Sequence, residues 1–270
     1  MNILQRLRGQ HQNEQDKPIV VVFAGGMGTQ ILQAATYFAL KKSGQSVWAD
    51  LSYFDTQAQM AEEGLTGKAT HWFWQLDQYG LRRDYFEPFS SKNLNKVRFL
   101  RDGAEMMQRG LHALSSPEIQ NYFQPVDKSS FDLPSEAMKP FLCIHMRRGD
   151  YLNVASHLVS DTEFLTLGKK FEGLIDNAVL LSDSPFTNEF KIKMNDLFRN
   201  VRYLDQTDPY TSHWLMRQAR ILVCSNSTYS LTAAILNFSA LVIMPKHWFG
   251  LNDQAIELPI QELCRFQIMS

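Results

Sequence analysis

The chain has 270 residues and a formal net charge of −1, and 44% of its residues are hydrophobic. This length can bury the core of one large domain or of two domains of ordinary size. A net charge so close to zero gives no reason to expect a nucleic-acid partner. We find no apolar stretch near the ~20 residues that a membrane-spanning helix needs, and no signal-peptide core at the amino terminus.

The three cysteines are Cys143, Cys224 and Cys264. The first two lie in apolar runs typical of strands, so we expect buried, reduced thiols in a cytoplasmic protein. No two cysteines have the C-x-x-C spacing common in metal sites, and no metal site is predicted. Residues 1–16 are rich in Gln and are expected to form a frayed polar extension outside the catalytic domains. A short amphipathic helix in peripheral contact with a membrane surface is the alternative.

The first predicted strand covers residues 18–23, and a glycine-rich turn follows it. Apolar residues then recur at helical spacing over 31–42, and a second strand is predicted over 46–49. These elements predict a β-loop-α-β unit. The glycines do not form the G-x-G-x-x-G fingerprint of a dinucleotide site, because Ile31 stands where the last glycine is required.

Residues 53–137 mix aromatic and charged segments and suit an acceptor-facing half. We expect a helix around 95–109, and we expect the aromatic residues near Trp74 to belong to the core rather than to a sugar-binding platform. The stretch 125–140 is the best candidate linker, because it is charged and rich in Pro and Ser.

Strands and helices alternate clearly after the linker. Strands are predicted over 140–144, 178–181, 201–204, 221–224 and 241–244, and helices over 161–171, 187–198, 209–220 and 229–237. Repeated βα units of this kind imply a parallel sheet covered by helices, as in a Rossmann-like nucleotide-binding domain. We therefore predict an amino-terminal domain over 17–137 and a carboxyl-terminal nucleotide-sugar-binding domain over 138–270.

Two arginines and an aspartate follow the strand predicted over 140–144, which ends next to His145. Arg147, Arg148 and Asp150 are therefore expected at the carboxyl end of a buried strand, the edge where open α/β sheets bind ligands. Planar guanidinium groups can contact two phosphate oxygens at once, which favours a diphosphate ligand. An exposed Arg-Asp pair is the alternative, because surface ion pairs are common.

Five segments in chain order resemble motifs of the α1,2-fucosyltransferases, which transfer fucose from GDP-fucose to a galactose-type acceptor. His145-x-Arg147-Arg148-x-Asp150 resembles the H-x-R-R-x-D signature of that family. The other segments are 23–30 (like G-G-L-G-N-Q), 121–124 (like G-Y-F-Q), 225–230 (like S-N-S-[ST]-F-S) and 242–249 (like V-I-A-P-x-x-W-F). The resemblance therefore covers nearly the whole chain.

The resemblance implies a GT-B-like α/β fold, in which two Rossmann-like halves face each other across a cleft. It also implies an inverting, metal-independent transfer of L-fucose from GDP-fucose to the 2-hydroxyl of a galactoside. The absence of any D-x-D pair from the sequence agrees with metal independence. Stabilisation of the departing nucleotide then falls to Arg147 and Arg148, and Arg147 is expected to contact the β-phosphate.

Further donor-binding residues are expected at other strand ends of the second half. Ser225, Asn226, Ser227 and Thr228 precede a predicted helix. Hydroxyls and free backbone N–H groups at a helix start suit an anion, although they also suit an ordinary N-cap. With the resemblance, these residues are assigned to phosphate or ribose binding. Asp183 resembles the acidic position of the family's S-D-D block and is expected to bind guanine, with a solvated aspartate as the alternative.

Gly25, Gly26 and Gln30 match the opening family block and are expected to bind the donor or acceptor. The sequence departs from the family at two positions. Thr29 stands where the family has Asn, and Ser184 stands where a second acid is usual. These departures leave the contact at residue 29 and the selectivity for guanine open.

Transfer also requires a group that accepts the proton of the acceptor hydroxyl. Asp150 and His145 are the candidates beside the arginines. Asp150 can instead orient the arginines, and His145 can equally be a hydrogen-bonded core residue. The sequence leaves the base unassigned.

The leading hypothesis is a galactoside α1,2-fucosyltransferase that decorates a bacterial cell-surface polysaccharide, such as an O-antigen or a capsule. Its expected partners are GDP-fucose and a galactose-containing glycan, at the inner face of the plasma membrane or in the cytoplasm. One alternative keeps the fold but uses another GDP-sugar or a non-galactose acceptor. Another is a non-catalytic nucleotide-sugar-binding protein.

Overall fold

A computed structural model describes residues 17–62, 73–90, 97–127, 139–153, 158–205, 207–245 and 266–268. The chain divides into two compact units, Met1–Val126 and Asp127–Ser270. The division lies inside the predicted linker 125–140. The predicted extension 1–16 lies outside the described residues.

The first unit contains a three-stranded parallel sheet in the order β2-β1-β3. Its strands are β1 (Ile19–Val22), β2 (Val47–Asp50) and β3 (Arg98–Leu100). Its helices are α2 (Met27–Lys42), α3 (Ser52–Glu62), α4 (Ala104–Leu114) and α5 (Pro117–Gln120), with 3-10 turns η2 (Asp77–Tyr79), η3 (Arg83–Tyr85) and η5 (Asn121–Phe123). The predicted β-loop-α-β unit is confirmed by β1, α2 and β2.

The helix predicted around 95–109 is wrong in its first half. Strand β3 occupies part of that stretch and pairs with β1 in parallel, with Arg98 opposite Ile19. Helix α4 begins only at Ala104, after Gly103, whose φ of 142° is not helical. Pairing with β1 gives the β3 backbone its hydrogen-bond partners, and this tertiary gain outweighs the local helical spacing.

Aromatic rings fill the core of the first unit. The ring centroid of Phe23 lies 5.0 Å from that of Phe86 and 5.6 Å from that of Trp74. Trp74 also lies 5.4 Å from Phe86, and its indole N–H donates to the Leu81 carbonyl at 2.8 Å. The expectation of a core residue is therefore confirmed for Trp74 and wrong for Phe73, whose side chain is 52% exposed. Trp72 lies outside the described residues.

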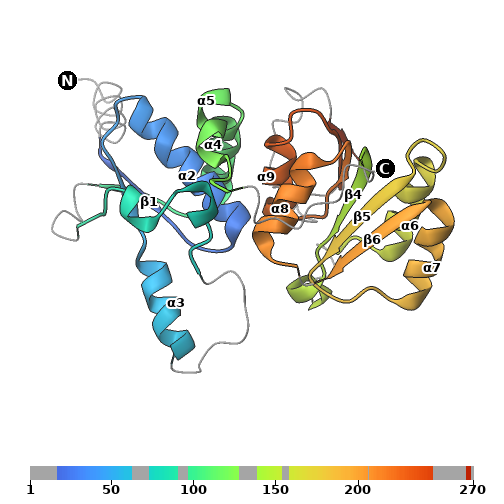
Figure 1. Cartoon of the computed structure of the whole chain (residues 1–270). Helices are drawn as coiled ribbons and strands as arrows, with labels where there is room; N and C mark the ends of the chain where they lie inside the picture. The colour runs from blue at the N-terminus through green and yellow to red at the C-terminus, as the bar shows by residue number, and fades with distance from the viewer. Residues whose placement is uncertain are drawn as a thin grey trace, which may run out of the picture. The chain divides into compact units, whose positions relative to one another are not determined.

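The second unit contains a six-stranded parallel sheet in the order β6-β5-β4-β7-β8-β9. Its strands are β4 (Phe141–Met146), β5 (Asn177–Ser182), β6 (Asn200–Asp205), β7 (Ile221–Val223), β8 (Leu241–Met244) and β9 (Phe266–Ile268). Its helices are α6 (Asp161–Lys170), α7 (Asn188–Leu197), α8 (Pro209–Gln218) and α9 (Thr228–Ile235), and η7 (Gly149–Asn153) follows β4. Helices α6 and α7 lie on one face of the sheet, and α8 and α9 lie on the other (Figure 1).

Local sequence explains these elements. All six residues of β4 and all six of β5 are buried, as expected for central strands of a parallel sheet covered on both faces. Helix α6 begins with a capping box, in which Ser160 accepts from the backbone N–H of Glu163 and the Glu163 side chain accepts from that of Ser160. Helices α8 and α7 each have a simple N-cap, in which the side chain of Asp208 or Thr187 accepts from a backbone N–H of the first turn.

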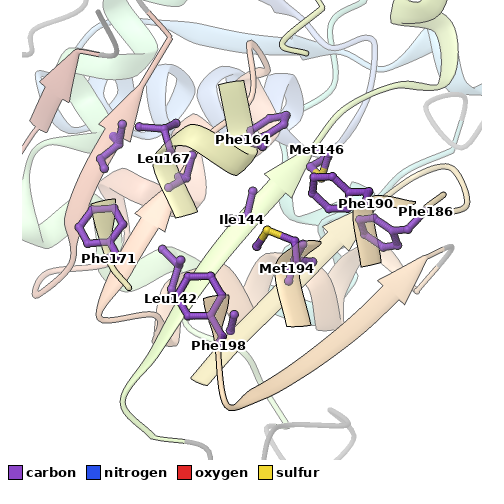
Figure 2. Packing of buried hydrophobic residues seen from close by; sticks show 14 of the residues in the cluster. Leu142, Ile144, Met146, Phe164, Leu167, Phe171, Phe186, Phe190, Met194 and Phe198 are labelled. Carbon is purple, nitrogen blue, oxygen red and sulfur yellow. The ribbon is translucent and has the colours of Figure 1, made fainter. Parts of the chain in front are cut away.

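A continuous apolar core lies between the sheet and the helices α6 and α7 (Figure 2). Residues of β4 pack in one cluster with large side chains of both helices: Leu142, Ile144, Met146, Phe164, Leu167, Phe190 and Met194. Burial of each large side chain stabilises the fold by roughly 1.5–3 kcal/mol. This core fixes the strand ends that carry the sequence motifs.

Every strand and helix predicted between residues 140 and 244 is present, within about three residues at its ends. Strand β9 was not predicted. Two α/β halves with parallel sheets are confirmed, and their placement across a cleft stays a prediction. Within the described residues, no helix has both the length and the apolar character to cross a bilayer.

Candidate functional site

The order of the strands in the second unit places its topological switch point between β4 and β7. The chain runs outward from β4 to β5 and β6, and then crosses to β7 on the other side of β4. Consecutive strands therefore diverge at this point, with their helices on opposite faces. Ligands of open α/β sheets bind outside the carboxyl ends of such diverging strands. The segments after Met146 and after Val223 flank this position.

Arg147 leaves the end of β4 and contacts the end of β5. Its Nη1 atom lies 2.9 Å from Oδ2 of Asp183, and its guanidinium lies 5.6 Å from the ring centroid of Tyr151. The side chain is 26% exposed. The strand-end arginine predicted to meet a phosphate is thus partly accessible at the diverging strands.

Asp183 faces the backbone of the turn after β4. Its Oδ1 atom accepts from the backbone N–H groups of Arg148 at 2.8 Å and Gly149 at 3.0 Å. Its Oδ2 atom has almost no exposed surface and accepts no aligned hydrogen bond among the described residues, so its contact with Arg147 is an ion pair. The guanine contact predicted for Asp183 stays a prediction, since the carboxylate in this structure serves the turn.

The Arg148 side chain packs against the start of α6. It is buried, pairs with Asp161 at the start of α6, and lies over the Phe190 ring with 5.9 Å between its guanidinium carbon and the centroid. Asp161 neutralises its charge, and Phe190 packs against its plane. Of the two predicted catalytic arginines, Arg147 is therefore the more accessible to a ligand.

His145 is a buried, hydrogen-bonded side chain at the end of β4. Its Nδ1 atom lies 2.8 Å from Oγ of Ser225, and its ring centroid lies 5.4 Å from that of Tyr229. Burial, with a smaller contribution from the charge of Arg147, lowers the pKa of His145 to about 3. His145 is therefore neutral at physiological pH and a weak proton acceptor.

The segment from Ser225 to Thr228 connects β7 to α9. Ser225, Asn226 and Ser227 are buried. Ser227 caps α9 by accepting from the backbone N–H of Tyr229 at 3.3 Å, so the N-cap interpretation is confirmed. Binding of phosphate or ribose by these four residues stays a prediction. Such binding would use the backbone N–H groups of the first turn of α9 and the side chains of these residues.

Asp150 lies in η7, directly after the turn held by Asp183. Its side chain is outside the described part of the structure, so both roles predicted for it stay predictions. The same holds for residues 246–249 of the last motif.

A hollow of about 840 Å³ lies at the opposite edge of the same sheet. It is lined at the amino ends of the strands by residues that include Pro140, Asn177, Arg220 and Leu241. None of the strand-end motif residues lines it. In an open α/β sheet, the carboxyl edge is the one that binds the ligand.

The sequence profile described as "Glycosyl transferase family 11" matches residues 117–254, more than half of the 270-residue chain. The chain belongs to glycosyl transferase family 11. The match contains the ends of β4, β5 and β7, and thus every site residue described above. No curated protein matches the chain significantly.

Solved structures resemble this family 11 chain only distantly. The E. coli heptosyltransferase WaaC with ADP is 10% identical with a TM-score of 0.49, over 93% of this chain and 92% of that chain. POFUT1 in complex with GDP-fucose is 13% identical with a TM-score of 0.44, over 82% and 94%. NodZ α-1,6-fucosyltransferase soaked with GDP-fucose is 9% identical with a TM-score of 0.37, over 82% and 92%. TM-scores below 0.5 support no argument about the activity of the family 11 chain.

The opening motif of the family 11 chain lies in the first unit, outside the profile match. Gly25 has a φ of 76°, which lets the chain turn into α2. Gly26 is the N-cap residue of α2. Gln30 is fully buried, and its amide donates to the carbonyls of Gly25 at 2.8 Å and Phe73 at 2.9 Å and accepts from the N–H of Gln75 at 2.8 Å. Both Nε2 hydrogens of Gln30 are used, so a ligand contact through its side chain would use the second lone pair of Oε1 or replace one of these bonds. Backbone contacts at the two glycines stay a prediction.

The sequence did not identify several residues that shape the site in the second unit. Asp161 pairs with Arg148, Gly149 lies against Asp183, and Tyr229 lies between two histidine rings, 5.4 Å from His145 and 5.3 Å from His213. Gly149 lies inside the H-x-R-R-x-D motif and Tyr229 inside the 225–230 motif, so the sequence carried a signal at both positions. Asp161 gave no signal, because no local pattern marks its pairing with Arg148.

Proposed function

We propose that this family 11 glycosyltransferase transfers L-fucose from GDP-fucose to the 2-hydroxyl of a galactoside, by an inverting and metal-independent reaction. The observation that carries the proposal is the position of Arg147. It leaves the carboxyl end of β4 where the strands diverge, inside the motif that resembles H-x-R-R-x-D. A partly accessible guanidinium at that position is suited to a diphosphate.

In the proposed transfer, the acceptor oxygen bonds to the anomeric carbon of fucose while the bond from that carbon to the β-phosphate oxygen breaks. The electron pair of the broken bond stays on GDP, and the acceptor proton passes to a base. Negative charge grows on the β-phosphate as the bond breaks. The charge of Arg147 therefore stabilises the transition state more than the bound donor, which is the condition for acceleration.

The backbone N–H groups at the start of α9 supply a second positive end at the same edge of the sheet. Ser227 is the N-cap of this helix, and the buried Ser225 hydroxyl contacts Nδ1 of His145. A helix amino terminus attracts phosphate through the N–H groups of its first turn and its dipole. Arg147 and this helix start together would bind the diphosphate from two sides.

Asp150 is the proposed proton acceptor, and orientation of the arginines is its alternative role. His145 is a poor choice for the base, because burial holds its pKa near 3 and its Nδ1 is bonded to Ser225. A weak base accepts a proton inefficiently from a hydroxyl.

The test is incubation of the full chain with GDP-fucose and a β-galactoside in the presence of EDTA. We expect release of GDP in step with formation of a fucosylated product, whose linkage is read by nuclear magnetic resonance. Arg147→Ala is the matched inactive variant. Activity that appears only after manganese or magnesium is added would contradict the metal-independent mechanism.

Competition experiments separate the remaining alternatives. GDP-mannose that is consumed in place of GDP-fucose would identify a different donor. Tight GDP binding by calorimetry, with no turnover over a broad panel of glycans, would identify a non-catalytic nucleotide-sugar-binding protein. The departures from the family at Thr29 and Ser184 motivate this last comparison.

A further inference from the structure

Asp183 and the turn from Arg147 to Gly149 form one compact assembly. The carboxylate accepts two backbone N–H groups of the turn through one oxygen and forms an ion pair with Arg147 through the other. These contacts join the end of β5 to the end of β4 across neighbouring strands. One side chain thus fixes both the path of the turn and the direction of the arginine on it.

Gly149 allows this assembly because it has no side chain. A Cβ atom at residue 149 would lie 2.8 Å from Oδ2 of Asp183 and 3.3 Å from its carboxyl carbon. Such distances are too short for a stable contact, so any other residue would push the carboxylate away. Only glycine lets the turn approach Asp183 this closely.

We infer that Asp183 is a positioning residue, which holds the turn from Arg147 to Gly149 so that Arg147 meets the β-phosphate of the donor. This inference rests on the proposed function and assigns Asp183 a task other than reading the guanine base. The ion pair also restricts the long arginine side chain before the donor binds. Less side-chain freedom is then lost when Arg147 contacts the phosphate.

Two substitutions separate the charge of Asp183 from its position. Asp183→Asn keeps an oxygen for the two backbone N–H groups but removes the negative charge that pairs with Arg147. Gly149→Ala keeps the carboxylate and every polar group but pushes the carboxylate out of place. Asp196→Asn, on the exposed face of α7, is the matched control for loss of one negative charge.

The readout is the affinity of the full chain for guanosine, GMP and GDP by calorimetry. For the wild type, we expect GDP to bind more tightly than GMP, because Arg147 contacts the β-phosphate. Asp183→Asn and Gly149→Ala should each weaken GDP binding by on the order of ten- to a hundredfold, the scale of a charge-assisted hydrogen bond. Guanosine affinity should not change in either variant, and Asp196→Asn should leave all three affinities unchanged.

A double-substitution cycle provides the second measurement. If Gly149→Ala acts only by displacing the carboxylate, it should have no further effect on GDP affinity once Asp183 has been replaced by alanine. Asp183→Ala leaves two backbone N–H groups without their acceptor, so its thermal unfolding is measured in parallel. Should that variant fail to fold, the ligand series on Gly149→Ala alone still decides the question.

The outcomes are distinct. Equal losses for guanosine, GMP and GDP, with weaker rejection of adenosine, would show that Asp183 reads the base and would overturn the inference. Unchanged preference for GDP over GMP in both variants would overturn it as well. A wild-type chain that binds no GDP would overturn the proposed function, and the inference with it.

Discussion

The Nδ1 atom of His145 lies 2.8 Å from Oγ of Ser225, a contact that ties the end of β4 to the segment after β7. Both side chains are buried, and the Tyr229 ring packs against the imidazole. These two strands flank the topological switch point of the second unit. The pair therefore holds the two sides of the site at a fixed spacing.

His145→Asn should retain most of the transferase activity, because an asparagine amide can replace Nδ1 as the partner of Ser225. We expect kcat to fall by less than about tenfold, whereas loss of a general base costs roughly 10²–10⁴-fold. Steady-state kinetics with GDP-fucose and a galactoside measure the difference. His145→Ala is the paired variant, and its larger loss should be accompanied by lower thermal stability. A hundredfold drop in kcat for a well-folded His145→Asn would identify His145 as the base.

Arg147→Lys should be severely impaired in turnover, although the positive charge remains. Lysine is a point charge and cannot present two N–H groups to a phosphate at once. We expect kcat/KM to fall by on the order of a hundredfold, the scale of a lost transition-state hydrogen bond. The exposed control Arg199→Lys, which follows α7, should be as active as the wild type. Comparable activity of Arg147→Lys and the wild type would show that bidentate contact is not required.

The neighbouring arginine should affect stability instead. Asp161→Asn leaves the buried guanidinium of Arg148 without its counter-charge, and we expect it to lower the free energy of unfolding by roughly 1–3 kcal/mol. Arg147→Ala should lower the free energy of unfolding by a smaller amount, because the Arg147 side chain is 26% exposed against 11% for Arg148, so solvent screens its ion pair more. Urea unfolding of both variants measures the contrast. A larger loss of stability for Arg147→Ala than for Asp161→Asn would show that Arg147, and not Arg148, forms the structural ion pair.

How much of this site follows from the sequence depends on the distance between partners along the chain. The strand ending next to His145 is evident from its continuous apolar run, and the strand-end arginines follow from it. The bond between Arg148 and Asp161 spans 13 residues, that between Gly149 and Asp183 spans 34, and that between His145 and Ser225 spans 80. Such contacts depend on which loops the sheet order brings together, and local patterns contain no information on that order.

The first unit shows the same limit. We expected a helix around 95–109 from the sequence, and pairing with β1 makes residues 98–100 a strand. Gln30 matched a family block, which suggested a ligand contact, whereas its amide connects Gly25 to the segment of Phe73 and Gln75. A motif residue can thus hold the backbone around a site, while the ligand contact of Gln30 stays a prediction.

Ser227→Asp should separate helix capping from ligand binding. Aspartate caps a helix as well as serine does, but Ser227 is buried, so the added charge should lower the free energy of unfolding, and GDP affinity is measured on protein shown to be folded. The added negative charge would repel a phosphate at the start of α9, and GDP affinity should fall by at least about tenfold, since ~1.4 kcal/mol corresponds to that factor. Ser227→Asn keeps the cap without the charge and should bind GDP normally. Full GDP affinity in Ser227→Asp would place the phosphates away from this helix.

Stability should decrease as the pH falls below about 6.5, because two buried histidines stay neutral in the folded chain. Burial first, and the charge of Arg147 second, lower the pKa of His145 to about 3. Burial, together with the charges of Arg217 and His145, also lowers the pKa of His213 well below its usual value. Above pH 6.5 these histidines are neutral in both states and contribute no pH dependence. Between pH 6.5 and pH 3 the unfolded chain binds protons that folded His145 does not, which favours unfolding.

Each such histidine should lower the free energy of unfolding by about 1.4 kcal/mol per pH unit in this range. Urea unfolding at pH 8, 7, 6 and 5 measures the slope, before most carboxylates begin to titrate. His213→Asn removes one buried imidazole and should flatten the dependence, whereas His112→Gln, at an exposed position of α4, should leave it unchanged. Equal slopes for the wild type and His213→Asn would mean that His213 takes up its proton in the folded state. Its full burial and its 3.3 Å contact with the Thr232 hydroxyl argue against that outcome.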